Sequence, residues 1–175
     1  PEVKHSEFGD QFLGNWATEV CRVTADWSPG HVLAETLTEI GEQVQEGEKV
    51  LVAVSGGVDS SVVASLVVQA LGSDRVHCVF VDNGLLREGE VAEMRELLGH
   101  VNPIVVDARE RFFAALAGVS APEAKRKIIG KLFIDVLQEE AVRLDAVAAG
   151  DAGDESKIAW LAQGTLYSDV VESMS

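Results

Sequence analysis

The chain has 175 residues, of which 47% are hydrophobic and 25% are charged, and its formal net charge is -15 at pH 7. This composition is typical of one globular domain with a buried core. The negative charge argues against a nucleic-acid groove or an anionic membrane surface as a partner, because the chain would repel both. It does not exclude nucleotides, which a protein can hold locally and through a metal ion.

The two cysteines, Cys21 and Cys78, are too few for a disulfide framework and lack metal-ligand spacing. They are interpreted as reduced core thiols of a cytoplasmic protein. No apolar run approaches transmembrane length, and the first ten residues do not have the pattern of a signal peptide. Because the chain starts at Pro1 without a methionine, a fragment or a processed product is expected.

After a helical lead-in, the first half of the chain predicts a helix, a strand and a second helix. The first helix begins at Pro29, with Ser28 as its N-cap. Residues 49–54, KVLVAV, are continuously apolar, as in strands of parallel sheets that are buried on both faces. The second helix is expected over residues 59–71.

The second half of the chain continues the alternation of strands and helices. Strands are expected at residues 76–81, 103–108 and 158–164, helices at 88–98 and 121–144, and an exposed loop at 145–157. This order implies βαβ units. The predicted fold class is therefore α/β, a parallel twisted sheet with helices on both faces.

The junction between residues 50–54 and the following helix has the sequence SGGVDSS, residues 55–61. Gly56 and Gly57 allow a tight turn and a close approach of backbone N–H groups to a ligand. The helix N-terminus favours an anion, and the serines add hydroxyl groups. Asp59 would repel phosphates unless a Mg²⁺ ion is shared between them; the alternative is that Asp59 only caps the helix.

Competing motifs fail on their details. No Lys follows the glycines as a Walker A loop requires, the two glycines are adjacent rather than spaced as G-x-G-x-x-G, and Ala53 replaces the first glycine of a nucleophile elbow. His31, His77 and His100 lie in separate predicted elements without an evident acid partner, so no function is assigned to them.

SGGVDSS resembles the PP-loop of the N-type ATP pyrophosphatases, whose fold is of the adenine nucleotide alpha hydrolase type. Three further segments, VFVDNGLLREGE, PEAKRKIIGKLF and WLAQGTLYSDVVES, are similar in the same order to the GMP synthetase (glutamine-hydrolysing) family. The resemblance implies a ligase that adenylates XMP with MgATP and then aminates it with glutamine-derived ammonia, releasing AMP and pyrophosphate. Two alternatives stay open: another N-type ATP pyrophosphatase, such as a NAD synthetase-like amidating enzyme, and a non-catalytic nucleotide-binding module.

The resemblance also implies site residues. Those expected to bind ATP are Ser55, Gly56, Gly57, Val58, Asp59, Ser60, Ser61, Val81 and Asp82, with Asp59 as the Mg²⁺ ligand. Those that could contact the substrate or phosphates are Lys125, Arg126, Lys127, Gln163, Gly164 and Thr165. The basic run has the alternative of being a solvated helix face, and Trp160 and Leu161 are expected in the core.

By the same resemblance, residues 1–27 are the end of a class I glutaminase domain and a linker, and residues 28–175 are an incomplete ATP pyrophosphatase domain. Glu2 matches the carboxylate of the Cys-His-Glu triad, without its two partners. The basic lid, much of the XMP site and the dimerisation domain are expected after Ser175. The full protein is then expected to be a cytoplasmic homodimer, with its glutaminase domain in the same chain. Ser168, where the family usually has Pro, and a longer 145–157 loop are departures.

Overall fold

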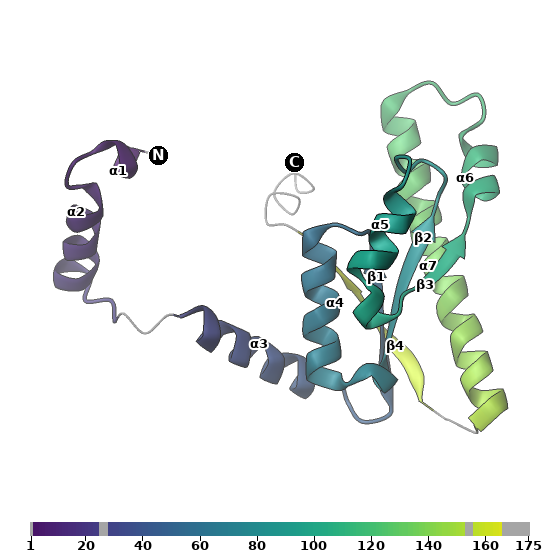
Figure 1. Ribbon diagram of the computed structural model, residues 1–175, viewed down its shortest axis with the longest axis horizontal. Helices are drawn as coiled ribbons and strands as arrows, with labels where there is room; N and C mark the ends of the chain where they lie inside the picture. The colour runs from purple at the N-terminus through teal and green to yellow at the C-terminus, as the bar shows by residue number, and fades with distance from the viewer. Residues whose placement is uncertain (1, 25–27, 153–155, 166–175) are drawn as a thin grey trace. The chain divides into compact units, whose positions relative to one another are not determined.

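The computed structural model describes residues 2–24, 28–152 and 156–165, without the side chains of Glu2, Asp151 and Ala152. The chain divides into two compact units, residues 1–35 and residues 36–175. The first unit contains α1 (Glu2–His5), α2 (Gly9–Asn15), the π-helical turn η1 (Trp16–Val20) and the first part of α3 (Pro29–Gln43) (Figure 1). The predicted cap of α3 is confirmed, because the Ser28 hydroxyl accepts a hydrogen bond from the His31 N–H at 3.2 Å.

The second unit is built on a four-stranded parallel sheet of order β3-β2-β1-β4. The strands are β1 (Glu48–Val54), β2 (Val76–Asp82), β3 (Ile104–Asp107) and β4 (Lys157–Gln163), so the four predicted strands are confirmed. β4, which comes last along the described chain, lies beside β1, which comes first (Figure 1). Because all strands run in the same direction, their carboxyl ends meet at one edge of the sheet.

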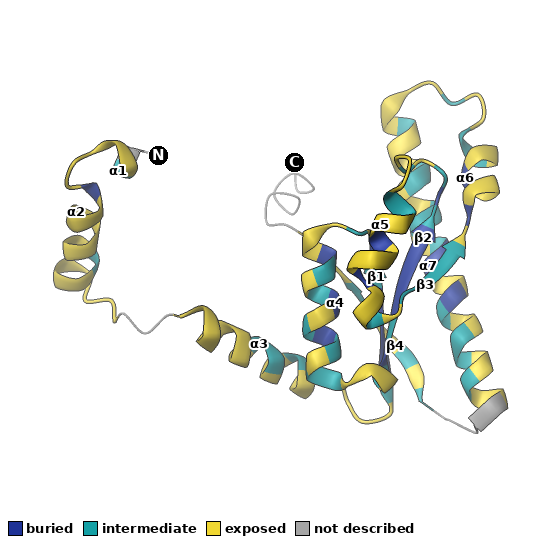
Figure 2. Cartoon of the chain, viewed as in Figure 1, coloured by how far each residue is buried: buried dark blue, intermediate teal, exposed yellow. Residues whose placement is uncertain are grey.

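Helices cover both faces of this sheet, as predicted. On one face, α4 (Val58–Leu71) and α5 (Glu90–Leu97) pack on alternate residues of β1 and β2, including Val52 and Phe80. On the other, α6 (Arg109–Leu116) and α7 (Pro122–Ala152) pack on Leu51 and Val79. Strands β1 and β2 are accordingly the most buried elements, whereas β4 is largely exposed (Figure 2). Two short 3-10 turns, η2 (Ser73–Arg75) and η3 (Gly99–Val101), complete the connections.

Helix α6 is absent from the sequence prediction. It follows β3 after a single residue, Ala108, and is held in the core by the fully buried side chain of Phe112. The Phe112 ring meets that of Phe133 on α7 edge to face, with centroids 5.3 Å apart. This arrangement of rings is favourable beyond the area that it buries, and it fixes α6 against α7.

The predicted loop at residues 145–157 is wrong over its first part, because α7 continues to Ala152. Gly150 costs about 1 kcal/mol in a helix relative to alanine, but Ala146, Ala148 and Ala149 have the highest helix propensity of all residues. Residues 153–155 lie outside the described part. The Asp145 carboxylate accepts a hydrogen bond from the Ile158 N–H at 2.9 Å, which ties the helix to the start of β4.

Three further expectations are corrected. Trp160 and Leu161 are not core residues but 37% and 45% exposed, because β4 forms an edge of the described sheet. Cys21 is exposed, whereas Cys78 is buried and its burial raises the pKa of the thiol to about 11. His31 does have an acid partner, since its Nε2 lies 3.1 Å from the Glu35 carboxylate.

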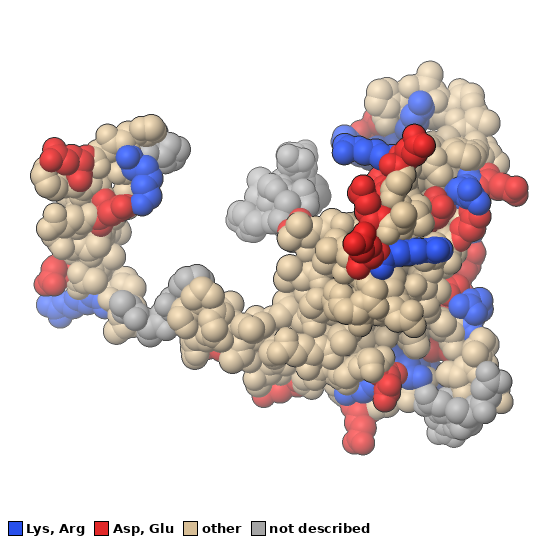
Figure 3. Space-filling model, viewed as in Figure 1, with Lys and Arg blue, Asp and Glu red and all other residues tan. Residues whose placement is uncertain are grey.

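The charged side chains of the second unit are interleaved by sign. On the face shown in Figure 3, acidic and basic groups lie next to one another over α5, α6 and α7, and the surface over α4 carries little charge. No helix among the described residues has the length and apolarity that crossing a membrane requires.

Candidate functional site

The loop between β1 and α4 is shaped by two glycines with different backbone conformations. Gly56 has φ +80°, in the left-handed region that favours glycine, and a Cβ there would lie 3.3 Å from the Met94 Cβ on α5. Gly57 has φ -78° and ψ 161°, an extended conformation open to any residue. Gly56 is thus required by the turn, whereas the absence of a side chain at Gly57 leaves its backbone open to a ligand.

The serine hydroxyls of the loop mainly bond to the loop itself. The buried Ser60 Oγ accepts from the Ser55 N–H at 3.2 Å, lies 3.1 Å from Ser55 Oγ and donates to the Gly57 carbonyl at 3.0 Å. Ser61 Oγ donates to the same carbonyl at 2.8 Å. The groups that remain for an anion are then the N–H groups of the first turn of α4, which have no intrahelical partners.

Asp59 does not cap α4. The N-cap residue is Gly57, without a side-chain cap bond, and Asp59 lies in the first turn with its side chain exposed. Among the described residues, none hydrogen-bonds to its carboxylate. Of the two interpretations left open by the sequence, the cap is therefore wrong, and the carboxylate remains available for a cation.

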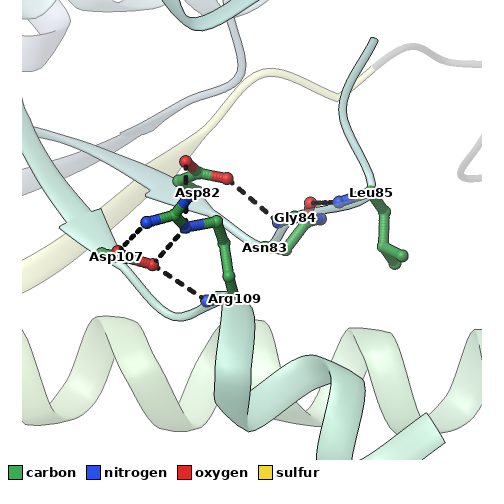
Figure 4. A network of polar contacts seen from close by, with 6 residues as sticks. All are labelled: Asp82, Asn83, Gly84, Leu85, Asp107 and Arg109. Atoms are coloured by element: carbon green, nitrogen blue, oxygen red, sulfur yellow. Dashed lines mark hydrogen bonds and ion pairs between the residues drawn. The ribbon is translucent and has the colours of Figure 1, made fainter. Parts of the chain in front are cut away.

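The carboxyl end of β2 carries a compact polar network (Figure 4). The Asp82 carboxylate accepts from the Gly84 N–H at 3.0 Å, and Asn83 Oδ1 accepts from the Leu85 N–H at 2.9 Å. Arg109, at the start of α6, forms a two-pronged pair with Asp107 through Nε at 2.9 Å and Nη2 at 2.6 Å. These bonds lower the pKa of Asp107 to about 2. Val81 points into the core, so only its backbone can face this edge.

The end of β4 reaches the same loop. Gln163 is the register partner of Ala53, and Gly164 follows it. A Cβ on Gly164 would lie 2.9 Å from the Ser60 nitrogen, so the two backbones are in close contact. Gln163, Gly164 and Thr165 are all exposed. Gly164 therefore lies against the 55–61 loop, whereas the positions of Gln163 and Thr165 relative to a ligand, and the role of each of the three, stay predictions.

The basic run Lys125, Arg126 and Lys127 lies on the exposed first turns of α7. Arg126 is 3.8 Å from Glu123, one turn earlier. Within the described part of the chain, no hydrogen bond or ion pair joins these side chains to residues 55–61. The geometry is that of a solvated helix face, and a role toward substrate stays a prediction.

Two predicted features lie outside the described residues, namely the side chain of Glu2 and the whole of Ser168. Conversely, Met94, Asp107 and Arg109 help to shape the site but were not predicted. Met94 packs on Gly56, and Arg109 joins the ends of β2 and β3. No sequence motif marks these three residues, because their importance arises from strands that are neighbours only in the folded sheet.

A groove of about 860 Å³ lies between α6 and α7; Asp107 and Arg109 of the polar network line one side of it, but no residue of the 55–61 loop does. The arginines of its lining are already paired: Arg109 bonds to Asp107, Arg111 to Glu139 at 2.6 Å, and Arg143 to the buried Glu140 at 2.5 Å. An anionic ligand would have to displace these carboxylates, so the loop at the sheet edge is the better candidate site.

The sequence model of the NAD synthase family matches residues 32–113. The curated relatives include three GMP synthases (glutamine-hydrolysing). Identity is 50% to the protein of Enterococcus faecalis, over 99% of this chain and 32% of that protein. It is 48% to that of Nitratiruptor sp., over 100% and 32%, and 48% to that of Alkalilimnicola ehrlichii, over 99% and 31%. The chain thus spans about a third of the length of these relatives.

Among solved structures, an NH3-dependent NAD synthetase from Campylobacter jejuni in complex with nitrate has a TM-score of 0.59 at 14% identity, over 85% of this chain and 72% of that one. At this identity the likeness supports the fold alone. The sequence matches place the similarities of the chain within one class of proteins, the N-type PP-loop ATP pyrophosphatases. Within that class its whole length is homologous to the GMP synthases, as the sequence motifs predicted.

Proposed function

We propose that this chain is the ATP-binding part of a GMP synthase that adenylates XMP and aminates it with ammonia from glutamine. The observation that carries the proposal is the 48–50% identity to three GMP synthases along 99–100% of the chain. The intact 55–61 loop supports it, because the segment that would hold ATP is present and correctly placed at the carboxyl edge of a parallel sheet.

In this proposal, residues 55–61 hold the β- and γ-phosphates, which leave together as pyrophosphate. The first-turn N–H groups and the positive end of the α4 dipole face the negative charge that grows on the departing group. The internal serine bonds keep these donors in place before the ligand arrives. Catalysis by positioned donors needs no covalent protein nucleophile.

A Mg²⁺ ion fits the donor set at Asp59. The carboxylate is exposed, carries no hydrogen bond from the described residues, and lies in the same helical turn as the proposed phosphate donors. Mg²⁺ is commonly held by one or two carboxylates together with substrate phosphates and water. When bound, it would offset the repulsion between Asp59 and the phosphates and neutralise charge on pyrophosphate.

Residues at the carboxyl ends of β2 and β4 complete the proposed site. Asp82 and the Val81 backbone would lie near the adenosine, and Gln163, Gly164 and Thr165 would border the phosphates from the other side. Lys125, Arg126 and Lys127 would contact the acidic substrate only if the intact protein brings XMP to the start of α7.

The first unit supports the proposed link to a glutaminase domain. Phe8, Phe12, Trp16 and Val20 recur every four residues along α2 and η1, and each is more than half exposed. Large apolar side chains at this spacing are typical of a helix that packs on further protein. We assign the stripe to the glutaminase domain of the same cytoplasmic protein, with Glu2 as its triad carboxylate, and we propose that the full protein is a homodimer.

The proposal is tested in two steps. The 175-residue chain should bind MgATP in isothermal titration, which tests the loop. The full-length protein should then release pyrophosphate only when XMP is present and form GMP from either glutamine or ammonium. Pyrophosphate release with no dependence on XMP would assign the chain to another N-type pyrophosphatase, and ATP binding without turnover would assign it to a non-catalytic module.

A further inference from the structure

Two carboxylates end neighbouring strands in register. Asp82 closes β2, Asp107 closes β3, and the two are direct register partners. Parallel strands lie about 4.8 Å apart, so two such groups repel unless a cation is shared between them. Arg109 is that cation: its Nη2 lies 2.6 Å from Asp107 Oδ2, and its Nε lies 3.9 Å from Asp82 Oδ2 (Figure 4).

The stem of Arg109 also supports the turn that follows β2. Gly84 has φ +71°, and a Cβ at this position would lie 3.1 Å from the Arg109 Cγ and 2.6 Å from the Phe113 Cζ. The backbone at Gly84 therefore rests directly on two α6 side chains. Since Asp82 Oδ1 accepts from the Gly84 N–H, the head and the stem of Arg109 act on the same short turn, residues 82–85.

This turn lies beside the phosphate-binding loop. β2 pairs with β1 up to Val54 and Phe80, so residues 82–85 and 55–57 both leave the sheet at its carboxyl edge. On the β4 side, the backbone of Gly164 already contacts Ser60. A ligand with its phosphates in the loop would therefore extend along the polar turn at the end of β2.

We propose that Arg109 is a positioning residue for the nucleoside part of the nucleotide, acting through Asp82 and the 82–85 turn rather than by touching the ligand. The inference rests on the proposed function, since it assumes that phosphates occupy the 55–61 loop. Arg109 holds one conformation of the turn before binding, which removes an ordering cost that binding would otherwise include. Arginine suits this role because its planar guanidinium donates two hydrogen bonds to Asp107, one of them from Nε, and Nε also lies near Asp82.

The test compares a ligand that has a nucleoside with one that does not. In the 175-residue chain, Arg109→Ala should weaken MgATP binding about tenfold and change Mg-tripolyphosphate binding less than about twofold. Arg111→Ala is the matched control, because it removes another arginine of α6 that pairs with Glu139 and not with the turn. Both dissociation constants are measured by calorimetry at low and at high salt, with the melting temperature of each variant recorded.

If Arg109→Ala weakened the binding of MgATP and of Mg-tripolyphosphate equally, the proposal would be overturned, because this would indicate a general loss of structure. A loss of MgATP affinity that disappears at high salt would also overturn it, since this is the behaviour of a screened charge. Unchanged MgATP binding in a folded Arg109→Ala variant would overturn it as well. Failure of the unmodified chain to bind either ligand would instead refute the proposed function, and with it the role of Arg109.

Discussion

The backbone of Gly164, at the end of β4, lies directly against the backbone of Ser60 in the 55–61 loop. A Cβ at Gly164 would lie 2.9 Å from the Ser60 nitrogen, closer than side-chain carbons approach backbone atoms, and 3.1 Å from the Asp59 carbonyl carbon, which is a tight contact. The end of β4 is thus fitted to the first turn of α4. Any group added here must move the turn that supplies the proposed phosphate donors.

Gly164→Ala should therefore weaken MgATP binding about tenfold or more and lower the free energy of unfolding by about 1–3 kcal/mol, as overpacking does. Isothermal titration and urea denaturation measure the two effects. Gly130→Ala is the control, because a Cβ there would meet nothing within 4 Å and should stabilise the helix without changing affinity. Normal binding by Gly164→Ala would show that the contact does not shape the site.

The two glycines of the loop should respond differently to substitution. Gly57→Val should fold normally, because the backbone is extended and a Cβ there would only touch Ser55 Oγ at 3.5 Å. It should nevertheless lose most MgATP affinity, since the new side chain covers the backbone of the loop. Gly56→Ala should instead lose about 1–2 kcal/mol of stability because of its left-handed backbone. Circular-dichroism melts and calorimetry on both variants measure stability and affinity. A loss of stability in Gly57→Val with normal MgATP affinity would contradict the expectation.

Asp59→Asn should raise the Mg²⁺ concentration needed for nucleotide binding about tenfold or more, with little change in melting temperature. The amide keeps a similar shape but loses the charge that a hard cation prefers. The lost interaction with the helix dipole costs only about 0.3–1 kcal/mol. Nucleotide titrations at several Mg²⁺ concentrations make the measurement. An unchanged Mg²⁺ requirement would remove Asp59 from the metal site.

His77 should make stability depend on pH. Burial, followed by the nearby charge of Lys49, lowers its pKa from the ordinary value of 6.5, whereas Asp145 and Glu140 oppose this. The folded state therefore binds fewer protons than the unfolded chain, and this stability is complete above pH 6.5 and lost as the pH falls through the lowered pKa. In urea melts from about pH 7.5 to about 5.5, His77→Gln should flatten the decline in the free energy of unfolding. If the free energy of unfolding fell equally with pH in the unmodified chain and in His77→Gln, His77 would not be the cause of the decline.

The elements with strong local signals could be predicted from the sequence. Continuous apolar runs predicted the strands, Ser28 with Pro29 predicted the start of α3, and the SGGVDSS motif predicted both the loop and the family. The failures had two different causes, namely tertiary packing at α6 and a local helix propensity in α7 that the prediction underestimated. Phe112 holds a short helix that has little signal of its own, and the alanines after Asp145 outweigh Gly150.

The site was predictable only in part, for a related reason. Residues 55–61 are consecutive, so their spacing carries the information. Asp107 and Arg109 were missed because their place in the site depends on the strand order β3-β2-β1-β4, which brings distant segments side by side. Trp160 was wrongly assigned to the core because its hydrophobicity does not tell a central strand from an edge strand.

The placement of β4 beside β1 has a consequence for the order in which the molecule is built. The Trp160–Glu48 hydrogen bond that joins the two strands spans 112 residues. At a synthesis rate of about 5–20 residues per second, Ser60 is added to the chain roughly 5–20 s before Gly164. The 55–61 loop consists of consecutive residues, but the site around it is completed only when β4 pairs with β1, which is distant in sequence. Such a long-range pairing slows the formation of the site. A nucleotide that binds this edge would stabilise chains in which β4 has docked beside β1 over chains in which it has not.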